Sequence, residues 1–215
     1  MKKILASIIF VSVFCSLNAQ VIKLQVGTSI SKLDWKIPTT NDQLYDMAFT
    51  GNSFFLGIDY LKNGNYNLTT NIGYLQKGGK SESELSDPWG IFTGQTIVDK
   101  PTLNYLSFNT AIDFNYPLSE QVLPFICGGP RIDFLIGHSD DFSYLEKNDE
   151  LKKIAYGLLF GAGIKLNISK IQIGLKGDYY LNFSKIAEWN ESLLRTAGEI
   201  TDDTFTLMLS LGYAF

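Results

Sequence analysis

The sequence of 215 residues is 45% hydrophobic and 19% charged, which excludes both a disordered chain and a bundle of apolar spanning helices. The formal net charge of −4 at pH 7 argues against nucleic acid as a partner, because proteins that bind it present a basic face. The length suits one domain, and the many tyrosine, phenylalanine and glycine residues are typical of strands with aromatic anchors.

Residues 1–19 have the three parts of a secretory signal: two early lysines, an apolar run, and Asn18-Ala19 as a cleavage end. The chain is therefore predicted to divide into a signal peptide, 1–19, and a single mature domain, 20–215. Cleavage would leave 16 basic against 22 acidic residues. It would also remove Cys15 and leave Cys127 without an intramolecular partner, so the disulfide-scaffold class is excluded.

Eight segments then alternate large apolar residues with small or polar ones at period two, which is the pattern of strands with unlike faces. Each has about the length at which a tilted strand crosses a bilayer. In chain order the predicted strands are Val21–Lys32, Ser53–Leu61, Asn65–Gln76, Thr102–Tyr116, Leu123–Gly137, Ala155–Ile168, Ile171–Phe183 and Thr204–Phe215.

Two of these segments carry extra information. The last one has the clearest alternation, because six large apolar residues from Phe205 to Phe215 share one face and no charge falls on that face. The fifth is interrupted by the run Gly128-Gly129-Pro130. A proline removes a hydrogen-bond donor from the ladder, so a bulge or kink is predicted near this run.

The connections alternate between long and short, which is how outer-membrane barrels place large loops outside and tight turns in the periplasm. The short connections are Lys62–Asn65, the residues around Pro117–Ser119, and Ser169-Lys170. The long connections are Leu33–Asn52, Lys77–Pro101, His138–Ile154 and Ser184–Asp203. Within the last two, Tyr144–Lys153 and Ala187–Ala197 are predicted as short helices.

Together these patterns predict an all-β fold, an eight-stranded antiparallel up-and-down transmembrane β-barrel with short periplasmic turns and long extracellular loops. The predicted location is the bacterial outer membrane, in contact with its lipid. A soluble lipocalin-like barrel is the alternative. Aromatic-rich apolar faces, alternating loop lengths and balanced charges on the opposite faces favour the membrane barrel.

The polar faces of the predicted strands carry four cations and four anions. An eight-stranded lumen is narrow enough to be filled by its own side chains, and buried charges there must be paired. The sequence therefore predicts a structural luminal charge network. Its members are Lys23, Asp59, Asp113, Arg131, Asp133, Lys165, Lys176 and Asp178.

Several of these strands also resemble a known family. The run Tyr105–Phe108, the pair Gly129-Pro130, the run Gly161–Gly163 and the tyrosine-rich seventh strand resemble the PorT-type (porin-family) outer-membrane β-barrel domain. Asn109 departs from that family, which often has proline there. The resemblance implies an outer-membrane location and, for some relatives, a link to secretion machinery. It implies no catalytic residues, since the family shares no catalytic motif.

Candidate chemistry is sparse. His138, followed by Ser139 and two aspartates, is placed where outer-membrane hydrolases and acyltransferases hold such groups. The acidic residues of the third and fourth long loops, among them Asp202 and Asp203, match no calcium-loop spacing and indicate a solvated rim. The three tryptophans are expected in long loops as interfacial anchors or partner contacts. No catalytic residue, metal or cofactor is predicted.

The leading functional hypothesis is a small non-enzymatic barrel with a structural, assembly or surface-interaction role and a lumen plugged by charged side chains. Narrow solute transport or membership of a secretion complex is the alternative, and a rim hydrolase or acyltransferase using His138 is a further one. Phe215 resembles the terminal aromatic that the barrel-assembly machinery recognises, so that machinery is an expected partner. A surface or secretion-complex protein is the other.

Overall fold

The computed structural model describes residues 21–36, 45, 47–63, 65–86, 92–191 and 197–215. The predicted signal peptide, Gly64 and Trp89 lie outside these residues. The strands are β1 (Val21–Lys36), β2 (Met47–Asn63), β3 (Tyr66–Ser86), β4 (Phe92–Asp99), β5 (Thr102–Asn115), β6 (Val122–His138), β7 (Ile154–Ile168), β8 (Ile171–Asn182), β9 (Ala187–Trp189) and β10 (Gly198–Ala214). A 3₁₀ turn, η1 (Asp140–Phe142), and a short helix, α2 (Ser143–Lys147), lie between β6 and β7.

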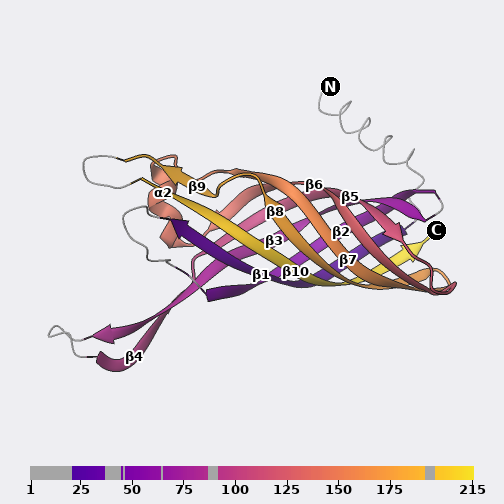
Figure 1. The fold of residues 1–215 in the computed structure, drawn as a ribbon, viewed down its shortest axis with the longest axis horizontal. Helices are drawn as coiled ribbons and strands as arrows, with labels where there is room; N and C mark the ends of the chain where they lie inside the picture. Colours follow the sequence, from indigo (N-terminus) through magenta and orange to yellow (C-terminus); the bar gives the residue numbers. More distant parts are fainter. Residues whose placement is uncertain (1–20, 37–44, 46, 64, 87–91, 192–196) are drawn as a thin grey trace, which may run out of the picture.

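Eight of these strands close into an antiparallel barrel in the order β1-β2-β3-β5-β6-β7-β8-β10, and β10 pairs with β1 (Figure 1). The closing register runs without a shift from Val21 opposite Ala214 to Lys36 opposite Glu199. Full closure leaves no open edge among the eight strands. The predicted barrel, and the predicted closure of the last strand onto the first, are confirmed.

The barrel is apolar outside and polar inside. On β10, Leu209 and Leu211 are each 59% exposed, whereas Thr206, on the other face, is fully buried. The same inversion holds on the neighbouring strands, where the exposed positions are isoleucine, leucine, phenylalanine and tyrosine. A continuous apolar exterior is unfavourable in water and suits the hydrocarbon of a bilayer. The short turns lie at the end that holds the C-terminus (Figure 1).

Several strands extend beyond their predicted outer ends. Gln76 was the predicted end of the third strand, but β3 continues to Ser86 and forms a hairpin with the additional strand β4. The run from Lys77 onward has glycine, serine and charged residues in place of large apolar ones, so the alternation stops while the backbone pairing continues. Figure 1 shows this hairpin projecting away from the loop end of the barrel.

The loop predictions hold in part. A short helix lies within the predicted Tyr144–Lys153 segment, although α2 covers five residues and ends at Lys147. The predicted helix at Ala187–Ala197 is wrong at its start, because Ala187–Trp189 forms strand β9 and pairs with the start of β10, while residues 192–196 lie outside the described residues. Within the described residues, no helix is long and apolar enough to cross a membrane.

No register shift lies at Gly128–Pro130, so the predicted bulge is wrong, although the β5–β6 pairing is interrupted between Arg131 and Gly128. The β6–β7 register continues through this run, with Gly128 opposite Phe160 and Pro130 opposite Leu158. The shift in β6 lies nearer the outer end, between the pairs that Asn104 and Tyr105 make. Glycine at 129 allows the close approach of β5, because a Cβ there would collide with the Thr110 carbonyl.

Candidate functional site in the barrel lumen

The charged residues predicted for the lumen occupy the inward phase of their strands, and each is 8% exposed or less. Lysine, arginine and aspartate are rarely so buried unless they are paired. The eight are Lys23, Asp59, Asp113, Arg131, Asp133, Lys165, Lys176 and Asp178.

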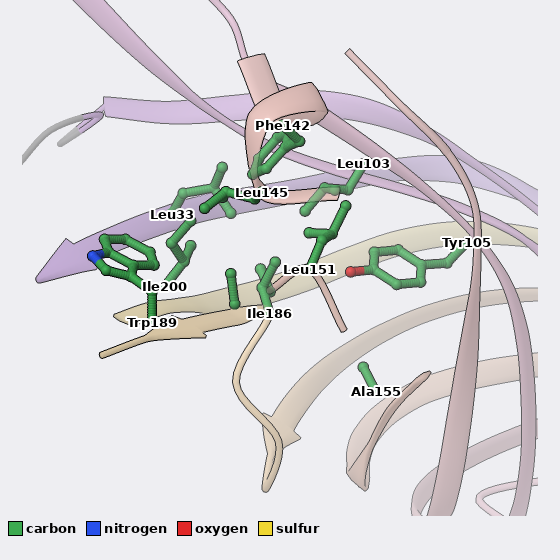
Figure 2. Packing of buried hydrophobic residues seen from close by; sticks show 11 residues of the cluster. Leu33, Leu103, Tyr105, Phe142, Leu145, Leu151, Ala155, Ile186, Trp189 and Ile200 are labelled. Atoms are coloured by element: carbon green, nitrogen blue, oxygen red, sulfur yellow. The ribbon is translucent and has the colours of Figure 1, made fainter. Parts of the chain in front are cut away.

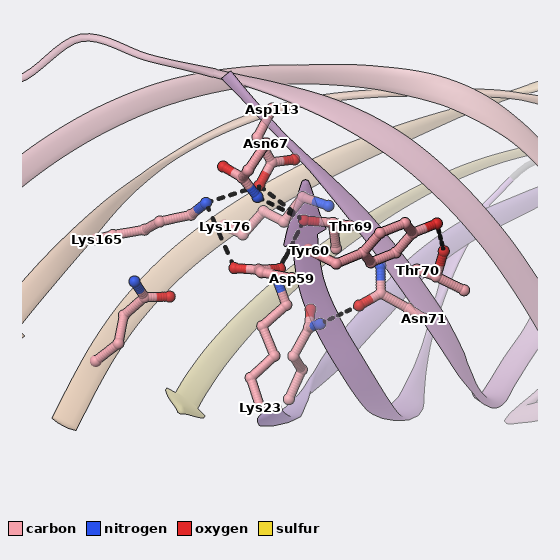
Figure 3. A network of polar contacts seen from close by, with 12 residues as sticks. Lys23, Asp59, Tyr60, Asn67, Thr69, Thr70, Asn71, Asp113, Lys165 and Lys176 are labelled. Carbon is pink, nitrogen blue, oxygen red and sulfur yellow. Dashed lines mark hydrogen bonds and ion pairs between the residues drawn. The ribbon is translucent and has the colours of Figure 1, made fainter. Parts of the chain in front are cut away.

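An inner cluster occupies the half of the lumen nearest the short turns (Figure 3). The Lys23 ammonium lies 2.6 Å from Asp59 Oδ1, and the Lys165 ammonium lies 2.7 Å from Asp113 Oδ2. The Thr69 hydroxyl lies between the two carboxylates, 2.7 Å from Asp59 and 3.0 Å from Asp113. Two cations and two anions therefore form one connected, neutral unit.

A separate ion pair lies on strand β8, beyond the inner cluster. Lys176 Nζ is 3.0 Å from Asp178 Oδ1 on the same inward face. The buried Cys127 thiol also points at this carboxylate oxygen, with its sulfur 3.7 Å away. The cysteine is thus part of the luminal packing.

An outer cluster contains two residues that the sequence reasoning missed. Lys77 was predicted to lie in a long loop and Asp202 in an acidic rim, but both are buried inside the barrel. The Lys77 ammonium lies 3.0 Å from an Asp202 oxygen and 3.3 Å from an Asp133 oxygen. Arg131 also pairs with Asp133, and its guanidinium lies over the Tyr180 ring at 4.7 Å.

A weak signal for Lys77 was present in the sequence. Lys77 continues the odd-numbered series of Asn67, Thr69 and Asn71, whose side chains are all buried inside the barrel. Asp202 likewise shares its parity with Thr204, whose hydroxyl donates to the Asp202 carboxylate at 2.8 Å. If the alternation of inward and outward side chains is continued beyond the large apolar residues at the outer ends of these strands, it places both Lys77 and Asp202 inside the barrel.

With these two residues included, the buried charges of the described chain are five cations and five anions. The charge of this set is zero, which is the arrangement that a sealed, low-dielectric interior requires. The cations are Lys23, Lys77, Arg131, Lys165 and Lys176, and the anions are Asp59, Asp113, Asp133, Asp178 and Asp202.

An apolar cap lies at the outer end of the barrel, and Figure 2 shows its side chains packed together. It adjoins the outer charge cluster, because the Lys77 ammonium lies 5.2 Å from the centre of the Tyr105 ring. Phe142 of η1 and Leu145 of α2 are buried against Leu33 of β1 and Ile200 of β10. Trp189 of β9 belongs to the same cluster and is 7% exposed, so its predicted place at an interface or on an open surface is wrong. The apolar sides of η1, α2 and β9 thus pack together with the outer ends of the barrel strands.

Trp35 joins this cap from β1. Its ring centroid lies 5.9 Å from that of Phe142 and 6.4 Å from that of Trp189. Tyr45 packs on the same indole at 5.3 Å. Aromatic contacts at these distances stabilise packing beyond simple burial. The cap is therefore a small core of its own at the outer end of the barrel.

His138 lies at the outer end of β6, beyond the length that a strand needs to cross the bilayer. Its Nε2 is 3.1 Å from the Glu146 carboxylate on α2, and its Nδ1 is 2.8 Å from the Ser139 carbonyl oxygen. The Ser139 hydroxyl donates to Asp141 and does not contact the imidazole. Both ring nitrogens therefore contact the segment that carries η1 and α2. His138 and Ser139 are not arranged as a general base and a nucleophile.

The Ser139 carbonyl, together with the Glu146 carboxylate, raises the pKa of His138 above its ordinary value, although partial burial opposes the shift. No group of histidine, cysteine or acidic side chains within the described residues has the arrangement of a metal site. Two of the rim acids, Glu146 and Asp141, are partners of neighbouring protein groups.

Comparisons with known proteins agree with this architecture. A family model described as "Outer membrane protein beta-barrel domain" matches residues 14–188. The chain is similar to the outer membrane protein OprG from Pseudomonas aeruginosa, with 11% identity and a TM-score of 0.57 over 93% of this chain and 97% of that one. At this identity the likeness shows the fold alone. No curated protein matches the sequence.

Two further solved structures are similar at lower scores. The attachment invasion locus protein Ail of Yersinia pestis is 17% identical, with a TM-score of 0.43 over 92% of this chain and 99% of that one. Neisserial surface protein A is 10% identical, with a TM-score of 0.46 over 90% of this chain and 97% of that one.

Replacing Lys77 tests the outer charge cluster. The Lys77→Met variant keeps the side-chain length but leaves Asp133 and Asp202 with less positive charge around them, so we expect the free energy of unfolding to fall by about 3–5 kcal/mol. Denaturant titration of the refolded barrel in lipid vesicles measures it. The matched control is Lys80→Met in the same strand, because Lys80 pairs with Glu82 in a partly exposed position. That change is expected to cost less than about 1 kcal/mol. Equal effects of the two substitutions would contradict a buried role for Lys77.

The contact between His138 and Glu146 predicts that the stability of the cap depends on pH. Because the folded pKa of His138 is raised, the stabilisation is complete below the ordinary histidine pKa and is lost as pH rises through the higher folded value. Hydrogen exchange of residues 139–151 should therefore be slower at about pH 6, after correction for intrinsic rates, than at about pH 9. The His138→Gln variant keeps a polar side chain and should lose this pH dependence. A pH dependence that persists in that variant would assign the effect to another group.

Proposed function

The chain belongs to the outer membrane protein beta-barrel domain family, and from this premise we propose that it is a closed, non-enzymatic barrel whose lumen is plugged by its own side chains. The observation that carries this proposal is Lys77, which links Asp133 of β6 to Asp202 of β10 across the barrel interior. The apolar cap lies above that link. Its place is the bacterial outer membrane, and its role is structural or one of surface interaction.

Two alternatives follow from the same premise. Narrow solute transport requires a continuous polar path, which the ion pairs and the apolar cap oppose. Membership of a secretion complex is the other alternative, and it rests on the PorT-type resemblance of the four strand motifs. A rim hydrolase using His138 is disfavoured, because the ring is held by Ser139 and Glu146.

A surface-interaction role is favoured by the β3–β4 hairpin. Phe92 is 69% exposed and Ile97 is 52% exposed, and every residue of β4 before Asp99 is exposed. Among the described strands β4 pairs with β3 alone, so its other edge presents unpaired backbone groups. Such an edge accepts a strand from another chain, and exposed apolar side chains add contact area. The partner that fits is an extended segment of a protein at the cell surface.

Single-channel recording tests the plugged lumen. Wild-type barrel in a planar bilayer is expected to show no discrete conductance steps, because opening a path would separate buried ion pairs. The control removes the luminal charges and the cap together, by changing the ten buried charged residues to serine and shortening residues 140–151. This variant, once its heat-dependent SDS migration shows a folded barrel, should conduct. Regular conductance steps of the wild type would overturn the plugged lumen.

Crosslinking tests the hairpin. A photoreactive residue at Thr96 in living cells is expected to form a covalent adduct with a defined surface protein, since β4 offers an open edge. The same residue at Leu209, which faces lipid, is the matched control and should give no such adduct. Shortening the hairpin at residues 82–98 should leave the barrel folded and remove the interaction. Identical adduct patterns at the two positions would refute a specific role for the hairpin.

The role of Phe215 as an assembly signal is part of the same proposal. Phe215 is 73% exposed, and the ring contact that holds it is with Tyr213 at a centroid distance of 5.2 Å. Deleting it should therefore change the stability of refolded protein little but lower the yield in the outer membrane. Quantified membrane fractions and unfolding titrations measure the two effects, with Tyr116→Ala as an exposed aromatic control. Equal membrane yields of wild type and deletion would argue against recognition of Phe215.

A further inference from the structure

A basin opens at the end of the barrel that carries the short turns. Its volume is about 510 Å³, within the range of small-molecule sites. Five strands supply the polar residues Asp59, Asn67, Asn115, Lys165, Asn167 and Gln172, and the turn between β7 and β8 adds Ser169. Short turns of such barrels face the periplasm, so the basin is reached from that side.

The inner charge cluster forms the floor of this basin. Asp59 and Lys165 line it, and both are tied into the network with Lys23 and Asp113 (Figure 3). Beyond them, a cavity lined by Lys23, Asp113 and Lys176 measures about 10 Å³, which is the space of a single water. Among the described residues, the inner cluster thus narrows the lumen above the basin, which suits a binding site better than a channel.

The floor presents both signs of charge to a molecule in the basin. Asp59 Oδ1 already accepts from Lys23 and Thr69, at 2.6 Å and 2.7 Å. Asp59 Oδ2 has the Lys165 ammonium 3.9 Å away and receives no hydrogen bond from the described residues. An acceptor oxygen and an ammonium group thus lie side by side at the bottom of the basin.

The walls carry side-chain amides with unused hydrogen-bonding capacity. Gln172 Nε2 donates to Asn167 Oδ1 at 2.9 Å. Within the described residues this leaves the Gln172 oxygen as an acceptor and the Asn167 amide group as a donor. Leu123 and Ile171 supply apolar surface beside them. A ligand with alternating donors and acceptors and a small apolar part fits such walls.

We propose that this basin binds a short zwitterionic peptide from the periplasm. The ligand ammonium pairs with Asp59 Oδ2, its carboxylate pairs with Lys165, and its peptide groups bond to Asn167 and Gln172. The floor is already neutral, so a ligand with a net charge would leave an unpaired charge in an enclosed site. A zwitterion adds one charge of each sign and preserves the balance. This site is additional to the structural and surface role proposed above.

Calorimetric titration of the refolded barrel with the dipeptide alanyl-alanine tests the proposal. We expect saturable binding at one site. The N-acetylated, C-amidated dipeptide lacks both terminal charges and is expected to bind weaker by a factor on the order of ten or more. Equal binding of the two probes, or no saturable binding of alanyl-alanine, would overturn the proposal. Binding of a neutral disaccharide in place of the dipeptide would overturn it as well.

Variants locate the site without disturbing the charge network. Leu123→Trp fills the basin and should abolish binding, whereas Gln172→Leu removes one acceptor and should weaken binding roughly fivefold. Gln121→Ala is the matched control, because that side chain is exposed and does not line the basin. Heat-dependent SDS migration confirms that each variant is folded. Undiminished binding in Leu123→Trp would place the ligand elsewhere and refute the site.

The two proposals fail separately. Conductance reports on whether the luminal charge clusters and the cap close the barrel, whereas calorimetry reports on the basin below the inner cluster. A conducting barrel that binds the dipeptide contradicts the plugged lumen alone, and a closed barrel that does not bind it contradicts the basin alone.

Discussion

Pairing of charges inside a narrow, buried lumen is the constraint on which this structure depends. An unpaired lysine or aspartate in a narrow lumen costs several kcal/mol, so each must find an opposite charge within reach. The described chain meets this requirement with five cations and five anions, divided among an inner cluster, a central pair and an outer cluster. Because the barrel is closed by hydrogen bonds all round, the register and stagger of its strands set which of these charges can meet across its interior.

The two ends of the molecule meet this constraint in different ways. At the outer end, Lys77 joins the two sides of the lumen and the apolar cap packs above it. At the inner end the network stops short of the rim, and the space below it remains as a basin. In a barrel plugged as proposed, the lumen does not serve as a conduit. Its accessible features are then the projecting hairpin on one side of the membrane and the basin on the other.

Most of the fold followed from strand periodicity. Residues such as Leu209 and Leu211 recur at every second position, so their face, the strand and its contact with lipid were all predictable. Eight charged residues lay on the opposite phase of these strands and are buried in the structure. Lys77 and Asp202 were not predicted to lie inside the barrel, because the apolar alternation does not reach either residue, although the backbone pairing of their strands does. The run Gly128–Pro130 predicts a bulge because proline lacks a ladder donor, whereas the role of Gly129 is steric and depends on the approach of a neighbouring strand.

The sequence by itself thus determined the barrel, its closure, its polar inside and its loop asymmetry, because each depends on a local period or a local turn. Only the tertiary structure decided which charges meet. Lys77 lies on β3, whereas Asp133 lies on β6 and Asp202 on β10, and none of these three strands is adjacent to another in the sheet. Their contact depends on the curvature and stagger of the whole barrel, and no local pattern in the chain encodes that geometry.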